Sequence, residues 1–322
     1  MQSFKLFKTH HALFFEKSVL LFAHVIYLFL TVSVLFGLYA GLVSVGLLLG
    51  FLMYGKERIV PWTLRLYQAE EIVHHDAHHI KAITEKLSRR AKFTQVPAIY
   101  YIPSYISIAF SLKDKHQTAI AISDGLIRTH NYRALAGVIA HEVAHIKNND
   151  SELFTFADLL TRLSQGLAWL GWGLIVGNLV LVLFTNIGFS VALLLFAAYG
   201  LFNNLLLWSR RQKREANADR SAVLLLKDVA PLSEAIKNDR TVSNSLARIL
   251  LQPITCWADP SVLRTHTKAD LRLQSLHACL GHGGPTKIYQ WNQIPHTESM
   301  QSYQFLRDDI EIPKRHLNGL WF

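Results

Sequence analysis

Two long stretches of the chain lack any charged side chain, and they limit the possible folds more than any other feature. Neither Ser18–Tyr54 nor Gly166–Trp208 contains an Asp, Glu, Lys or Arg. A helix that crosses a bilayer needs about 20 apolar residues, and each stretch is roughly twice as long. Each stretch therefore predicts two transmembrane helices joined by a tight turn, near Gly37–Gly41 and near residues 185–188. Buried core helices and a signal peptide fit less well, because both are shorter.

Positive charges flank these stretches, whereas the predicted turns carry no charge. The flanking basic residues are Lys5, Lys8, Lys17, Lys56, Arg58, Arg65, Arg210, Arg211, Lys213 and Arg214. Because flanks rich in Lys and Arg stay in the cytoplasm, we expect a multi-pass protein of the cell (inner) membrane whose polar parts are cytoplasmic. The net charge of +10 then belongs to the membrane topology. We expect no nucleic-acid partner, since no basic cluster is interleaved with aromatic residues away from the membrane flanks.

The rest of the sequence forms two polar blocks on either side of the second charge-free stretch. We divide the chain into a cytoplasmic N-terminus (1–17), a first membrane hairpin (18–54), a first polar block (55–165), a second membrane hairpin (166–208) and a second polar block with a C-terminal tail (209–322). Hydrophobic periodicity predicts helices over Glu70–Arg90 and Asn131–Lys147. Three β-rich runs, Val96–Ile102, Ile106–Leu112 and Thr118–Ile122, predict a small sheet. The expected fold is mostly α with a small β-sheet, and the two blocks are expected to form one domain.

The motif with the clearest chemistry is H-E-x-x-H at residues 141–145, inside the second predicted helix. His141 and His145 are four residues apart and therefore lie on one helical face, where both imidazoles can hold one Zn²⁺. Glu142 lies beside them and can take a proton from water that the metal activates. The motif thus predicts two metal ligands and a general base.

A catalytic zinc site also needs a third protein ligand and an open position. An extended motif with a third His fails, because Asn148 and Ser151 stand where Gly and His would be needed. The one E-x-x-x-D sequence of the chain, Glu215 to Asp219, follows the second hairpin. We expect Glu215 to be the third metal ligand and Asp219 to accept a hydrogen bond from a ligand His. The alternative for Glu215 is a solvated helix position paired with a nearby Arg or Lys.

The order of two spans, H-E-x-x-H, two further spans and E-x-x-x-D resembles the HtpX-like membrane zinc metallopeptidases, which are relatives of the type I CAAX prenyl proteases. The resemblance implies four transmembrane helices in two hairpins plus a gluzincin-type zinc metallopeptidase domain. It implies one Zn²⁺ per chain, held by His141, His145 and Glu215. It also implies that His266 donates a hydrogen bond to the oxyanion and that the strand Ile108-Ala109-Phe110 pairs with the substrate backbone.

Three positions depart from the pattern of that family. Ile108 replaces an Asn in the strand motif Asn-Ala-Phe, and Gln212 replaces an Arg three residues before the ligand Glu. Thr267 replaces the Pro that follows the oxyanion His. The expected zinc ligands and Glu142 are all present, so the resemblance still implies an active enzyme with an altered substrate strand.

A second histidine cluster, His74–His79, contains two pairs of histidines four residues apart. No further ligand follows at a recognisable spacing. A polar helix face is the simpler interpretation, and a regulatory metal or pH-sensing role is the alternative.

Together these features predict a zinc metalloendopeptidase that hydrolyses peptide bonds near the cytoplasmic membrane surface. The resemblance to the HtpX-like metallopeptidases implies quality control of membrane proteins as its role. Its expected partners are protein or peptide substrates, above all membrane proteins, and the lipid bilayer. A dedicated processing protease for a lipidated or single specific substrate is one alternative. A non-catalytic, zinc-dependent membrane sensor is another, and it would bind zinc without turnover.

Overall fold

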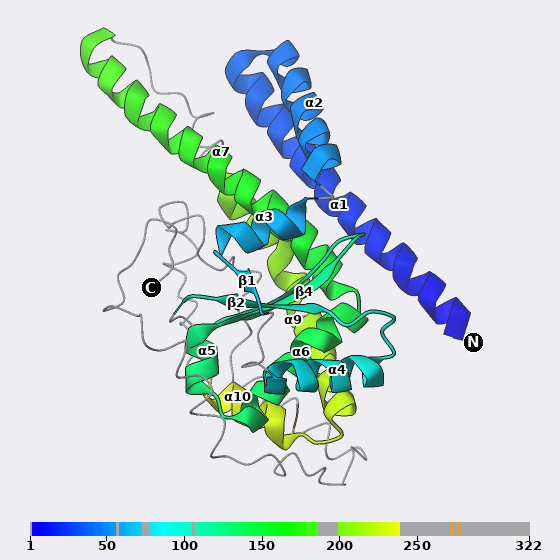
Figure 1. Cartoon of the computed structure of the whole chain (residues 1–322). Helices are drawn as coiled ribbons and strands as arrows, with labels where there is room; N and C mark the ends of the chain where they lie inside the picture. The colour runs from blue at the N-terminus through cyan, green and yellow to red at the C-terminus, as the bar shows by residue number, and fades with distance from the viewer. Residues whose placement is uncertain are drawn as a thin grey trace.

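The computed structural model describes residues 2–55, 58–72, 78–104, 107–185 and 199–238, together with Arg272 and Leu276. The helices are α1 (Gln2–Phe36), α2 (Leu38–Gly55), α3 (Ile59–Leu66), α4 (His78–Ala91), α5 (Asp124–Thr129), α6 (Tyr132–Lys147), α7 (Asp150–Thr185), α9 (Tyr199–Leu226) and α10 (Ala230–Asn238). The strands are β1 (Glu70–Glu71), β2 (Ala98–Ile102), β3 (Ala109–Lys113) and β4 (Thr118–Ser123). The predicted mostly helical fold with a small sheet is confirmed (Figure 1).

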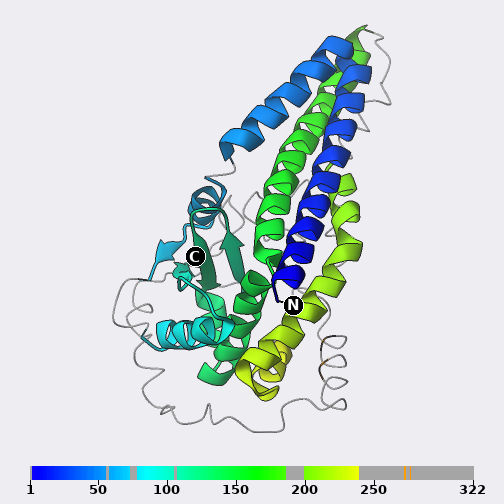
Figure 2. The same ribbon diagram turned by 90° about the vertical axis from the view of Figure 1, so that its right-hand side faces the viewer.

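The first charge-free stretch forms a helical hairpin. Its turn is the single residue Gly37, whose φ of +89° lies in the left-handed region that glycine adopts without strain. By length and composition, Phe14–Phe36 and Leu38–Gly55 could each cross a membrane. Figures 1 and 2 show α1, α2 and α7 projecting together from one side of the polar part of the molecule. The helical hairpin and its turn are therefore present, whereas its crossing of a membrane stays a prediction.

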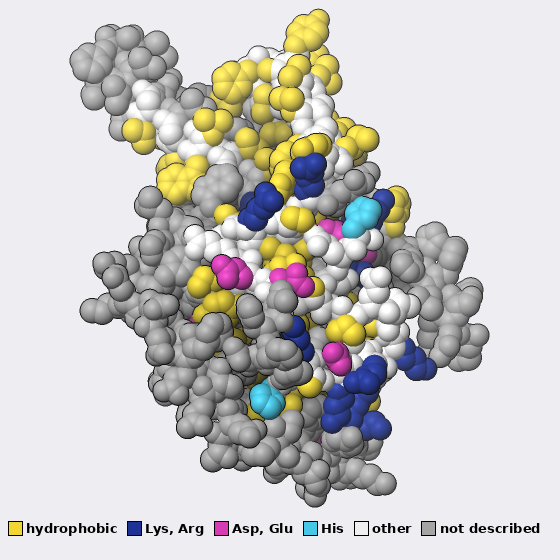
Figure 3. All heavy atoms as spheres, in the orientation of Figure 1, with side chains coloured by type: hydrophobic (Ala, Val, Ile, Leu, Met, Phe, Trp, Pro, Cys, Tyr) yellow, Lys and Arg dark blue, Asp and Glu magenta, His cyan; other side chains and the backbone are white. Residues whose placement is uncertain are grey.

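The second charge-free stretch is divided between two helices. Helix α7 continues from the polar domain through residues 166–185, and α9 begins at Tyr199. The predicted turn near residues 185–188 lies largely outside the described residues, which contain only the two candidate spans named above. In Figure 3, hydrophobic side chains gather on the projecting helices, and charged side chains lie on the body below them.

The sheet is mixed and has the strand order β1-β2-β4-β3. Strands β2 and β4 are parallel, whereas β1 pairs with β2 and β3 pairs with β4 in antiparallel fashion. The three predicted strands are all present. The predicted helix over Glu70–Arg90 is wrong at its start, because Glu70–Glu71 pairs with Tyr100–Tyr101 and the helix begins only at His78. Pairing with the sheet edge, which sequence periodicity does not reveal, holds this segment extended; Ile72 N also donates to Ile99 O.

Two hydrophobic clusters lie on opposite faces of the sheet. Residues of α4, α6 and α9 fill the first cluster together with Ile120 and Ile122 of β4. Residues of α3, α7 and the lower parts of α1 and α2 fill the second, with Ala119 and Ala121 of β4. Alternate residues of β4 thus serve opposite layers, as the pleat of a strand requires. The sheet thus lies between the cluster around the H-E-x-x-H helix on one side and the cluster formed by α3, α7 and the α1–α2 hairpin on the other.

Candidate metal centre

Helix α6 places the two histidines. Its start is fixed by Asn131, whose side chain oxygen accepts a hydrogen bond from Ala134 N at 2.9 Å. From there the helix runs without interruption, so His141 and His145 project from one face one turn apart. Both side chains are buried, at 2% and 4% exposure.

Helix α9 supplies the third side chain of the centre. Its small residues Ala218 and Ala222 are fully buried in the cluster around α6, which lets the two helices approach closely. The packing brings Glu215 to the histidine face of α6, where only 3% of it is exposed. Glu215 is therefore not the solvated helix position that the alternative interpretation required.

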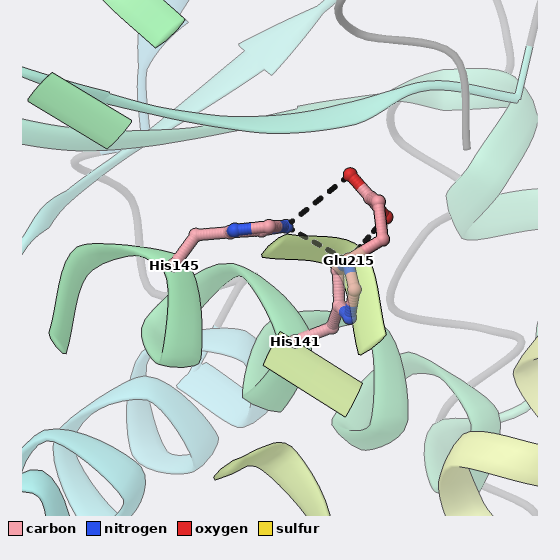
Figure 4. Close-up of side chains that lie close together, drawn as sticks. All are labelled: His141, His145 and Glu215. Carbon is pink, nitrogen blue, oxygen red and sulfur yellow. Dashed lines mark hydrogen bonds and ion pairs between the residues drawn. The ribbon is translucent and has the colours of Figure 1, made fainter. Parts of the chain in front are cut away.

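The three side chains converge on one point, with the carboxylate of Glu215 turned toward both imidazoles (Figure 4). The Nε2 atoms of His141 and His145 are 3.0 Å apart. Glu215 Oε2 lies 3.4 Å from the first of them, and Glu215 Oε1 lies 3.7 Å from the second. Ligands at the usual 2.0–2.1 Å around a tetrahedral Zn²⁺ are about 3.3 Å from one another. The observed separations bracket that value, so the residues fit the ion.

A carboxylate stands behind each histidine. Asp219 Oδ1 is 2.8 Å from Nδ1 of His141, and Asp150 Oδ2 is 3.3 Å from Nδ1 of His145. When Nδ1 of a neutral imidazole donates its proton to a carboxylate, Nε2 is left with its lone pair. Both Nε2 atoms face Glu215, so this arrangement directs two lone pairs to the same place. That is the tautomer that a metal site requires.

Arg272 was not singled out by the sequence, yet it is part of the centre. Its Nε donates to Asp219 Oδ2 at 3.0 Å and its Nη2 donates to Asp219 Oδ1 at 2.7 Å. Burial raises the pKa of Asp219, but the charge and hydrogen bonds of Arg272, together with His141, outweigh burial and hold that pKa well below its usual range. Asp219 is therefore ionised and able to accept the proton of His141.

The same surroundings change the protonation of His141. Burial and the charge of Arg272 lower its pKa, but the hydrogen bonds of Asp219 and Glu215 and the charge of Asp219 outweigh both and raise the pKa to about 9. Arg272 Nη2 also lies 3.3 Å from His141 Nδ1. The 2.8 Å contact with Asp219 is the shorter, so we assign the Nδ1 proton to that bond. Without a metal, the centre thus holds an imidazolium between two carboxylates.

Other predicted site residues lie nearby or outside the described part. Glu142 is buried on α6 directly beside His141. His266 lies outside the described residues, as do Gln212's side chain and Thr267. Most of the His74–His79 cluster is likewise outside them.

Strand β3 and the residue before it contain the predicted substrate residues Ile108, Ala109 and Phe110. Ile108 N donates to Ser123 Oγ, and Ser123 N donates to Ile108 O, both at 2.9 Å. In an antiparallel pair, successive residues direct their backbone groups alternately toward the partner and away from it. Ala109 and Ser111 therefore direct theirs to the outer edge, where no strand among the described residues pairs with β3. Ile108, which stands where the family has Asn, is thus a residue whose backbone groups face β4 and not the outer edge.

Sequence reasoning missed Asp150 and Arg272 for different reasons. Asp150 had a local signal, since Asn149, with a left-handed φ of 60°, turns the chain so that the next residue lies beside His145. Asn is one of the few residues that adopt this conformation readily. Arg272 had no local signal, because its contact with Asp219 joins residues 53 positions apart. Only the need of a buried carboxylate for a cation pointed to such a partner.

Two imidazoles from one helix and a carboxylate from another, each imidazole backed by an acid, define the class of H-E-x-x-H metal centres. The model of the family described as Peptidase family M48 matches residues 74–280, and the chain belongs to that family. The resemblance stated from the motifs is thereby confirmed.

The chain is also similar to individual known proteins. The chain is 34% identical to a protease HtpX homolog of Desulforapulum autotrophicum over 117 residues, which cover 36% of this chain and 38% of that one. It is 29% identical to the homolog of Salinibacter ruber over 204 residues, 60% of this chain and 69% of the other. The chain matches less than half the length of three such HtpX homologues, with 37% to 47% of each covered. The crystal structure of S. mikatae Ste24p aligns at a TM-score of 0.43 and 16% identity, over 84% of this chain and 66% of Ste24p. The HtpX homologues and the two apolar helices indicate a membrane protein.

Proposed function

We propose that the protein is an integral-membrane zinc metalloendopeptidase that hydrolyses peptide bonds near the cytoplasmic membrane surface. The observation that carries this proposal is the convergence of His141, His145 and Glu215, with donor atoms 3.0 to 3.7 Å apart and Glu142 beside them. Membership of Peptidase family M48 supports the same reaction. When bound, the ion supplies Lewis-acid activation of water and of the scissile carbonyl.

The residues of the chain perform the proton transfers and the orientation. Glu142 takes a proton from the attacking water and delivers it to the leaving amine. His266 donates a hydrogen bond to the developing oxyanion. Asp219 and Asp150 hold the Nδ1 protons of the two histidines, so that both imidazoles keep their orientation throughout the reaction.

The proposed substrate-binding strand is β3, which would pair with the substrate along its outer edge. The backbone groups of Ala109 and Ser111 that face this edge can pair with an extended peptide, as in other cases of strand addition. The next outward residue, Lys113, already donates its N–H to Thr155 Oγ1 at 3.3 Å. Substrate pairing therefore ends at Ser111 on that side.

Two features support cleavage close to the membrane by a multi-pass protein with four transmembrane helices and a cytoplasmic catalytic domain. Helix α9 is continuous from Tyr199 through Glu215, and the seven residues from Trp208 to Glu215 rise about 10 Å. Lys and Arg flank both charge-free stretches on the side of the polar domain. We therefore propose membrane proteins as substrates. Quality control of such proteins is the role that the similarity to protease HtpX homologues favours.

The test compares wild-type protein with Glu142→Gln after purification in detergent, with zinc analysis of both. Because Gln keeps the size of Glu but cannot accept the proton, we expect stoichiometric zinc in both proteins and loss of casein cleavage only in the variant. Retained cleavage by Glu142→Gln would contradict the catalytic role. Stoichiometric zinc in an inactive wild-type protein would favour the membrane sensor. In vesicles, faster cleavage of a membrane-anchored substrate than of its soluble form is expected.

A specific observation favours the processing of lipidated substrates as a second candidate. A cavity of about 530 Å³ lies between α2, α3 and α7, and its lining is apolar apart from Thr63 and Arg162. A pocket of this size can take a lipid chain. Cleavage of one peptide with and without an attached isoprenyl group separates the two candidates, since a dedicated processing enzyme requires the lipid.

A further inference from the structure

A chain of ion pairs connects the base of helix α1 to a ligand histidine. It starts at Glu16 of α1, whose carboxylate accepts a hydrogen bond from Nη2 of Arg214. Nη1 of the same guanidinium donates to Asp150 Oδ1. The other oxygen of Asp150 is the one that lies 3.3 Å from His145 Nδ1. Four helices, α1, α9, α7 and α6, are thus joined through one arginine.

The geometry of Arg214 makes this connection a rigid one. The residue directly precedes Glu215, so its position also sets the position of the third ligand of the centre. A guanidinium is planar and offers its donors in a fixed fork, whereas the ammonium of a lysine is a single flexible point. A lysine at this position would keep the charge but lose the fixed geometry between the two carboxylates.

Burial decreases along this series of ion pairs, from the metal centre outward to α1. The side chain of Asp150 is 3% exposed, that of Arg214 19% and that of Glu16 27%. Interactions of the inner pair are screened little by solvent, while those of the outer pair are partly screened. Loss of Arg214 must therefore affect the centre more than loss of Glu16, and both effects must have the same direction.

We propose that Arg214 is a positioning residue for the metal centre and that Glu16 makes the first candidate membrane helix part of its support. On this basis the helix pair α1–α2 does more than hold the protein in the bilayer. Docking of the base of α1 fixes Arg214, Arg214 fixes Asp150, and Asp150 fixes the imidazole of His145. The inference rests on the proposed function, because it concerns how well the same centre holds its ion and works.

The residue that follows Glu16, Lys17, provides a matched control. Lys17 Nζ pairs with Glu152 Oε1 at 2.5 Å. This ion pair joins α1 to α7, the same two helices that the ion pairs of Arg214 connect. Neither residue contacts a ligand of the centre among the interactions described. Lys17→Gln removes an α1–α7 ion pair and leaves the connection through Arg214 intact.

The experiment measures metal binding by the full-length protein in detergent. Variants Glu16→Gln, Arg214→Lys and Lys17→Gln are compared with wild type for zinc affinity, by chelator competition, and for the visible spectrum of the cobalt-loaded form. Loss of an outer support of a ligand histidine typically weakens binding about 10–100-fold. We expect that range for Arg214→Lys, a smaller loss with a shifted cobalt spectrum for Glu16→Gln, and wild-type behaviour for Lys17→Gln. Cleavage of a soluble peptide should show a lower kcat with little change in KM.

The outcomes separate this inference from the proposed function. If wild type binds zinc and depends on Glu142, but Glu16→Gln matches it in affinity and spectrum, only the role of α1 is overturned. Equal losses in Glu16→Gln and Lys17→Gln would also overturn it, because general loosening of α1 would then explain both. If wild type binds no zinc, the proposed function and this inference fail together. If Arg214→Lys does not fold, the zinc affinity and cobalt spectrum of Glu16→Gln still test the role of α1, because Glu16 is the more exposed residue.

Discussion

The Oδ1 atom of Asp219 lies 2.8 Å from Nδ1 of His141, so the carboxylate one helical turn beyond Glu215 supports a proposed ligand on another helix. The two residues are 78 positions apart in the sequence. Asp219 in turn accepts hydrogen bonds from Nε and Nη2 of Arg272. The proposed ligand is therefore oriented by a buried ion pair and not by the metal alone.

Replacement of Asp219 by Asn should weaken zinc binding. The amide keeps the shape of the side chain but loses the charge that favours a proton on His141 Nδ1. We expect about a 10–100-fold loss of zinc affinity, the usual effect of removing such a partner, measured by chelator competition. Asp114→Asn is the control, because the carboxylate of Asp114 accepts only from the N–H groups of His116 and Gln117, in the turn after β3, among the hydrogen bonds described. Unchanged affinity in Asp219→Asn would contradict the supporting role.

Zinc uptake should release a proton. The pKa of His141 is about 9 in the metal-free centre, so at pH 7.5 the ion must displace the proton on this imidazole. We expect about one proton released per zinc, and affinity that rises up to tenfold per pH unit until about pH 9. Titration calorimetry in buffers of different ionisation enthalpy measures the number of protons. Identical heats in all buffers would show that His141 is already neutral.

The metal-free protein should also lose stability as the pH rises. The pKa of His141 is raised above its usual value of 6.5, so its contribution to the free energy of unfolding is fully present below about pH 6.5. That contribution is lost as the pH passes through about 9. We expect the melting temperature of the chelator-treated protein to fall over this window, and to fall less in zinc-loaded protein. A melting temperature that rises with pH would have the wrong sign.

Arg272→Lys tests the buried pair with Asp219. Lysine keeps the charge but cannot donate to both carboxylate oxygens in parallel, so the free energy of unfolding should fall by about 1–3 kcal/mol. A lowered melting temperature measures this loss. Arg89→Lys serves as the control, since the pair of Arg89 with Glu85 is exposed and 3.6 Å long and should contribute little. Equal melting temperatures for both variants would argue against a special role of Arg272.

Gly137→Ala should destabilise the packing of α6 against α10. A Cβ at this position would lie 2.4 Å from Pro231 O, a backbone atom that cannot move aside alone. In an open helical position the same change would be neutral or favourable by up to about 1 kcal/mol. Gly173, in α7, has nothing within 4 Å of a built Cβ and is the matched control. We expect a lower melting temperature for Gly137→Ala alone.

The sequence predicted the parts of the centre that depend on helical spacing. His141 with His145, and Glu215 with Asp219, share helix faces because each pair is four residues apart. It could not predict Arg272, whose partner is 53 residues away, or the pairing of Glu70–Glu71 with the sheet. Both depend on tertiary contacts that no local pattern encodes. The hairpin turn at Gly37 was predictable, since it needed only an apolar stretch too long for one span and a glycine near its middle.

The proposed ligand set is split between two parts of the chain that the ribosome makes at different times. His141 and His145 emerge first, and the whole charge-free stretch 166–208 follows before Glu215 is synthesised. A nascent chain therefore carries an incomplete centre until that stretch and Glu215 have been made and α9 packs against α6. If the protein acts as proposed, the order of synthesis means that the growing polypeptide cannot cleave peptide bonds before residues 166–215 have been made.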